Sequence, residues 1–147
     1  MASNRETARD ALAALIDTAM VGTGKPVEAV YHYLVSDLAG QSPVVCVTSA
    51  GSLRVPLTRF GSRAEFLLRV DVFVLYNDQG GWTEADAEDR LDLIEATLAT
   101  LVDANQQTAP WQALSYAEPS SRTQAVTVLG GESYAWEAIT LRAEVYG

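Results

Sequence analysis

The apolar positions of residues 4–20 recur at steps of three and four, which is the spacing of one buried stripe on a helix. Ser3 or Asn4 can cap this helix, because their side-chain oxygens accept hydrogen bonds from the free amides of a first turn. Gly22 and Gly24 end it. We therefore expect a first helix from about Asn4 to Met20. Its stripe consists of Ala8, Leu12, Leu15, Ile16 and Ala19.

A second and longer stripe predicts a helix from Glu84 to about Asn105. Thr83 can cap it, and Asp86 follows three residues later in a near capping box. The stripe steps by 4, 3, 4, 3 and 4 through Ala87, Leu91, Ile94, Leu98, Leu101 and Asn105. The first turns carry acidic side chains, which the positive end of a helix dipole favours. These are Glu84, Asp86, Glu88, Asp89 and Asp92.

The remaining segments have the β-branched and aromatic character of strands. They are Glu28–Val35, Val44–Thr48, Ser52–Leu57, Arg63–Tyr76, Trp111–Tyr116, Thr123–Leu129 and Ser133–Tyr146. Ala50-Gly51 should turn between the second and third segments, and Gly130-Gly131 should join the last two as a hairpin. This order of elements predicts one α+β domain over residues 1–147, with a largely antiparallel sheet and both helices packed on one face.

The segment Arg63–Tyr76 is apolar on both of its faces. One parity carries Phe66, Leu68, Val70, Val72 and Val74. The other parity carries Leu67, Phe73 and Leu75. Because large apolar patches are seldom left in water, something should cover the second face. Loops of the same chain and a neighbouring subunit are both open possibilities.

Composition narrows the class of protein. The chain has 147 residues, of which 48% are hydrophobic and 20% charged, as expected for a domain with its own core. Its formal net charge of −9 argues against specific binding of nucleic acid. No apolar run is long enough for a membrane span, and charged residues interrupt the region of a signal peptide, so we expect assembly in a cytoplasm and no membrane partner.

The charge is unevenly distributed along the chain. Residues 43–77 carry a net +2, whereas residues 78–105 carry a net −7. The basic side chains of the first segment are Arg54, Arg59, Arg63 and Arg69. Acidic and basic surfaces of neighbouring copies could therefore meet head to tail, and ordinary surface scatter is the alternative.

Candidate chemistry is sparse, so we expect no enzyme, no cofactor and no metal. His32 is the one histidine, and as part of Tyr31-His32-Tyr33 it is expected to be a half-exposed strand residue and not a catalytic base. Cys46 lies between two valines and is expected to be a small buried residue. The glycines near Lys25 lack the spacing of a phosphate loop.

The order of elements resembles the tail terminator (tail completion) proteins of long-tailed, non-contractile bacteriophages. The resemblance covers nearly the full chain and has three parts: the opening helix, the run Val70–Tyr76 leading into Trp82–Glu88 and the acidic helix, and the closing Gly130–Glu137 hairpin. Head-completion and connector proteins of the same neck have similar size and composition.

This resemblance implies a structural virion protein at the neck end of the tail. Such proteins form a ring, usually a hexamer, which caps the tail tube, ends its polymerisation and joins it to the head connector or stopper. The genome would pass through without specific binding. A head-completion protein is the first alternative, and a small ligand-binding domain with a pocket around Tyr31, Tyr33, Trp111 and Trp136 is the second.

Two sets of residues follow as candidates for such a role. The segment from Gly40 to Ser62 is expected to be a docking loop, with a plain hairpin as the alternative. The candidate partner contacts are Leu53, Arg54, Leu57, Arg59, Phe60, Leu67, Phe73 and Leu75. An acidic lumen would repel phosphates, and its candidates are Glu84, Asp86, Glu88, Asp89 and Asp92.

Overall fold

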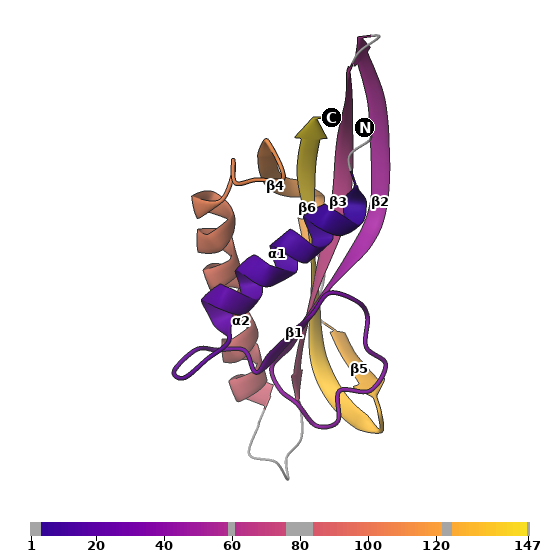
Figure 1. Cartoon of the computed structure of the whole chain (residues 1–147). Coiled ribbons are helices and arrows are strands. Elements are labelled where there is room, and N and C mark those ends of the chain that lie inside the picture. The colour runs from indigo at the N-terminus through magenta and orange to yellow at the C-terminus, as the bar shows by residue number, and fades with distance from the viewer. Residues whose placement is uncertain (1–3, 59–60, 76–83, 122–124, 147) are drawn as a thin grey trace.

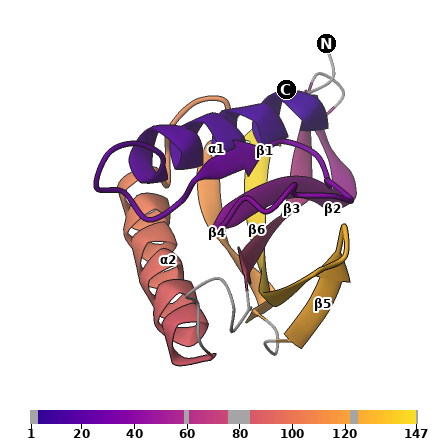
Figure 2. The same cartoon turned by 90° about the horizontal axis from the view of Figure 1, so that it is seen from below.

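Two helices pack on one face of a mixed, mostly antiparallel sheet (Figures 1 and 2), which confirms the predicted α+β class. The computed structural model describes residues 4–58, 61–75, 84–121 and 125–146. The elements in chain order are α1 (Arg5–Met20), β1 (Ala29–Tyr31), β2 (Val44–Thr58), β3 (Gly61–Leu75), α2 (Glu84–Ala104), β4 (Ala113–Ser121), β5 (Ala125–Leu129) and β6 (Glu132–Tyr146).

The sheet is built around the long strands β2, β3 and β6. Its order is β1-β2-β3-β6-β4, and β1 pairs with β2 in parallel whereas the other pairs are antiparallel. β4 and β5 share one edge of β6, β4 beside residues 139–144 and β5 beside residues 132–136. The outer part of the β2–β3 hairpin projects beyond the helices (Figure 1).

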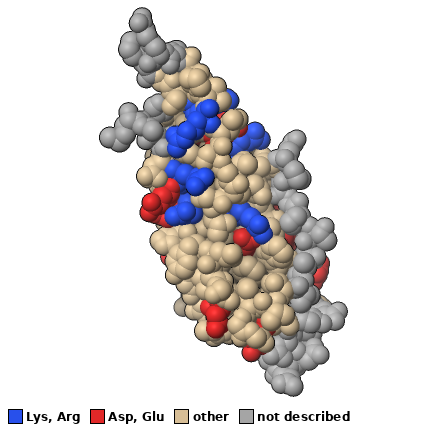
Figure 3. Space-filling model, turned by 90° about the vertical axis from the view of Figure 1, so that its right-hand side faces the viewer, with Lys and Arg blue, Asp and Glu red and all other residues tan. Residues whose placement is uncertain are grey.

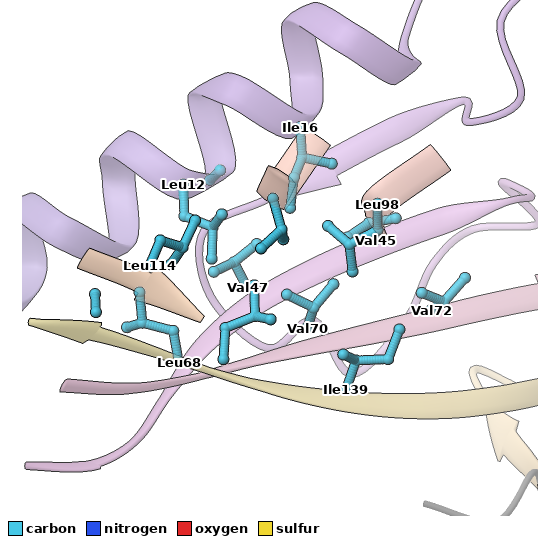
Figure 4. Close-up of a cluster of buried hydrophobic side chains, with 14 of the residues drawn as sticks. Leu12, Ile16, Val45, Val47, Leu68, Val70, Val72, Leu98, Leu114 and Ile139 are labelled. Carbon is cyan, nitrogen blue, oxygen red and sulfur yellow. The ribbon is translucent and has the colours of Figure 1, made fainter. Parts of the chain in front are cut away.

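The main core lies between this sheet and the helices. Side chains of β3 with even numbers, from Phe66 to Val74, are buried against Leu12 and Ile16 of α1 and Leu98 of α2, together with residues of β2 and β6 (Figure 4). These even-numbered residues of β3 are the ones that the sequence pattern assigned to one apolar face of the strand. Each fully buried aliphatic side chain of this size contributes about 1.5–3 kcal/mol to folding, so the layer accounts for the position of both helices.

A second, smaller core lies on the opposite face of the sheet, at the end nearer β5. Phe73 and Tyr134 are buried there with Leu38, Val44 and Cys46, and Leu75 packs against them half-buried. Loops of the same chain therefore cover this part of the second face, which was one of the two open possibilities. The predicted partner contact Phe73 is thus buried by its own chain and Leu75 is half-buried by it, and their contact with a partner stays a prediction.

Both helices agree with their predicted ranges, and the Asn4 side chain caps α1 by accepting a 2.8 Å hydrogen bond from the Glu6 amide. The Thr83 cap lies outside the described residues. The closing hairpin is also confirmed. Its two-residue turn has φ of +59° at Gly130 and +84° at Gly131, a conformation that glycine adopts without strain.

Two strand predictions are wrong. The predicted strand Glu28–Val35 pairs with β2 only at Ala29–Tyr31, because the chain then leaves the sheet to cover its second face. The predicted turn at Ala50-Gly51 is a bulge within β2, which continues to Thr58. The segment from Gly40 to Ser62 is consequently mostly one arm of a hairpin, the structural alternative that the sequence left open, and its docking role stays a prediction.

Candidate functional site: the open half of the sheet

The face of the sheet opposite the helices is covered over only half of its length. The covered half ends near Asp71 and Trp136. Beyond them, no described residue of either buried hydrophobic cluster lies on this face, and we call it the open half-face. The cross-strand register assigns to it Leu53 and Val55 of β2, Arg63, Glu65, Leu67 and Arg69 of β3, and Arg142, Glu144 and Tyr146 of β6.

Several apolar side chains of the open half-face and its hairpin contact water. Leu53 is 54% exposed and Tyr146 46% exposed, and Leu67 is half-buried. Leu57, nearer the hairpin tip, is 51% exposed. Of the predicted partner contacts, Leu53, Leu57 and Leu67 are thus accessible, whereas Arg59 and Phe60 lie outside the described residues.

Arginine side chains on the open half-face form ion pairs with neighbouring carboxylates. Arg63 pairs with Glu65 at 3.4 Å and with Glu144 at 3.9 Å, and Arg69 pairs with Asp71 at 2.8 Å. The Arg69 side chain is 39% exposed and that of Asp71 only 3%, so the guanidinium group lies above the carboxylate that it neutralises. Figure 3 shows basic side chains gathered over the upper half of this side. The open half-face therefore presents positive groups to a partner.

The base of the β2–β3 hairpin is braced by α1 and by a cation–π contact. Arg5 and Arg9 donate hydrogen bonds to Ser52 and Ser49 at 3.0 and 3.4 Å. The predicted contact residue Arg54 is on the helix side of the hairpin, with its guanidinium carbon 5.3 Å from the centre of the Phe66 ring. Arg54 therefore covers the end of the main core and belongs to the opposite surface from Leu53.

A cavity of about 450 Å³ marks the border between the covered and open halves. Asp71 is its buried polar group, at 2% exposure, and its Oδ1 accepts hydrogen bonds from Arg69 Nε and Trp136 Nε1. The Trp136 ring stacks on the Phe73 ring, with their centres 6.4 Å apart. The guanidinium carbon of Arg69 lies 5.2 Å from the centre of the Trp136 ring. This cluster fixes the outward direction of the Arg69 guanidinium.

The acidic candidates of α2 lie on the other side of the molecule from the open half-face. Asp86, Glu88, Asp89 and Asp92 are exposed, and the side chain of Glu84 is outside the described part of the chain. Leu93, a residue that the sequence analysis did not single out, is 48% exposed among them. Its exposure could have been predicted from the sequence, because Leu93 is not part of the apolar stripe of α2.

The four aromatic residues of the proposed ligand pocket do not come together. Trp111 is buried in the main core, where its indole donates a 2.7 Å hydrogen bond to the Asn105 carbonyl. Trp136 is on the opposite face of the sheet, and Tyr31 and Tyr33 line a hollow beside α1. The pocket predicted from these residues is therefore wrong.

His32 is half-exposed as expected but follows β1 and is not a strand residue, whereas Cys46 is buried as its two valine neighbours predict. His32 Nδ1 lies 3.1 Å from Asp10 Oδ1, with more than half of the imidazole exposed. Cys46 is fully buried, and burial raises the pKa of its thiol. No cluster of three or more metal-ligating side chains occurs among the residues described, and neither described helix is long and apolar enough to span a membrane.

Comparison with known proteins does not add a family. No protein-family model matches the chain, and no curated protein matches it either. The functional argument therefore depends on the surfaces described above.

Proposed function

We propose that this chain is a structural virion protein, a tail terminator that caps the tail tube of a long-tailed phage as a homo-oligomeric ring of six copies. The ring ends tube polymerisation and joins the tail to the head connector. The support for this proposal is a domain with two unlike surfaces, an open arginine-bearing sheet face and an acidic helix, and a hairpin that projects past its core.

The observation that carries the proposal is the open half-face itself. Leu53 and Leu67 are apolar neighbours there in the register of β2 and β3. Tyr146 lies opposite Arg63 further out, and arginines share the face. Protein interfaces combine apolar anchors with a polar rim in the same way. A capping protein needs one contact for its own copies and another for the tube, and the open half-face and the hairpin tip can supply the two.

The experiment is tube capping in vitro. Tail tube protein of the phage that encodes this chain is polymerised with and without the chain, and tube lengths are measured by electron microscopy. We expect shorter tubes with a ring at one end. Leu53→Asp should abolish capping, whereas Val128→Asp, at a residue 65% exposed on β5 at the end of the sheet away from the hairpin, should not. Unchanged tubes contradict the proposal.

The head-completion alternative predicts a different binding partner in the same assay. A neck connector would bind to filled heads and leave tube lengths unchanged. Sedimentation of the chain with heads but not with tails would therefore replace the terminator proposal with that alternative.

A further inference from the structure

The outer surface of α2 has an apolar centre with an acidic rim. Ala87, Leu91 and Leu98 face the core, so the opposite side of the helix carries Leu93. Asp89, one turn before Leu93, is exposed, and Ala96, one turn after it, is exposed and small. The exposed leucine is thus accessible between a carboxylate and a residue that permits close approach.

The open half-face has the complementary pattern. Leu67 is its half-buried apolar centre, and Arg142 lies directly opposite Leu67 in the register of β3 and β6. Arg142 makes a long 3.5 Å hydrogen bond to the Tyr116 carbonyl, and no described carboxylate forms an ion pair with it. Its charge is therefore available to an acidic partner.

The two surfaces also agree in length. α2 has 21 residues, which corresponds to about 31 Å at the rise of an α-helix. The open part of β3, from Gly61 to Arg69, spans about 30 Å at the rise of a strand. The two surfaces are therefore similar in length.

We propose that the partner of the open half-face is a second copy of this chain, and that α2 of one copy packs on the open half-face of the next. In this arrangement Leu93 contacts Leu67, and Asp89 pairs with Arg142. The inference rests on the proposed ring and names its subunit contact. A two-fold pairing of α2 with α2 would put carboxylates against carboxylates, which is repulsive. The head-to-tail contact avoids this and generates a ring when it closes.

This contact separates the acidic residues of α2 into two groups. Asp89 lies on the side of Leu93 and is covered by the neighbour. Glu88 and Asp92 are on the opposite flank of the helix, beyond Asp89 from Leu93, so they remain accessible. The accessible flank is then the one that can face a lumen.

The test is a charge exchange between two variants, Asp89→Lys and Arg142→Glu, measured by analytical ultracentrifugation. Each variant alone should assemble at least about tenfold more weakly than the wild type, because one contact per interface becomes repulsive. An equimolar mixture should recover assembly, since the lysine of one chain then meets the glutamate of the other and the two alternate around an even-numbered ring. Asp17→Lys and Lys25→Glu are matched charge reversals at exposed residues elsewhere and should assemble like the wild type.

A second pair of variants covers the case in which a reversed charge impairs folding. Leu93→Gln should weaken assembly, whereas Val128→Gln, at an exposed apolar residue of β5, should not. A mixture that stays dissociated, or a Leu93→Gln variant that assembles normally, overturns this contact and leaves the proposed ring standing if the wild type assembles. A wild type that is monomeric at every concentration overturns both.

Discussion

The indole Nε1 of Trp136 donates a 2.9 Å hydrogen bond to Oδ1 of Asp71, which also accepts from Arg69 Nε at 2.8 Å. The contact ties β3 to β6 where the covered half of the sheet ends. One buried oxygen therefore orients both an aromatic wall of the cavity and a cation at the border of the open half-face.

Replacing Asp71 should destabilise the fold. Asp71→Ala leaves the indole and guanidinium donors without their acceptor, and we expect a loss of about 1–3 kcal/mol in the free energy of unfolding. Asp71→Asn retains an acceptor oxygen and should lose less. Urea denaturation of the two variants measures the difference, and equal losses would show that the hydrogen bonds contribute little.

The Gly130-Gly131 turn permits a matched pair of alanine variants. A Cβ at Gly130 would overlap the Asp37 carboxylate, which accepts a hydrogen bond from the Ala39 amide, whereas a Cβ at Gly131 would enter open space. Both residues have positive φ, so each alanine has a backbone cost of about 1–2 kcal/mol. Gly130→Ala should lower the thermal midpoint further than Gly131→Ala, and the reverse order would contradict the packing of the loop on this turn.

Stability should fall at alkaline pH. Burial raises the pKa of the Tyr134 phenol, and the nearby Glu132 and Asp37 charges add to this effect. The folded state then holds a proton that the unfolded state releases above about pH 10, so the free energy of unfolding decreases as pH rises through that range. Tyr134→Phe should make this decrease smaller. Part of the decrease should remain in the variant, because burial also raises the pKa of the Cys46 thiol. Denaturation curves from neutral to alkaline pH provide the measurement, and an unchanged slope in the variant would refute the assignment.

Periodicity predicted the elements well where one face of an element is buried. The stripes of α1 and α2 and the parity of β3 are examples, because local spacing alone determines which residues meet the core. Periodicity did not predict burial where a segment distant in sequence covers a side chain. Phe73 is covered by Leu38 and Tyr134, and no local pattern predicts that contact. The same limit applies to the open half-face, since Arg142 and Leu67 become neighbours only through strand pairing.

The accessible flank of α2 should influence the passage of DNA. If Glu88 and Asp92 line the lumen of the proposed ring, their negative field repels phosphates and prevents the genome from adhering. Reversing both to lysine in the phage should slow genome ejection, measured by the release of DNA from purified particles. Asp17→Lys is the control, and ejection kinetics that match the wild type would remove these residues from the lumen.

The mass of the assembled protein tests the central claim most directly. Native mass spectrometry of the purified wild-type chain should show a species of six times the 15.8 kDa chain mass, and its abundance should rise with protein concentration. Added salt should reduce it, because ions screen the contacts between the acidic helix and the arginines. A single peak at the mass of one chain under all of these conditions would contradict the proposed ring.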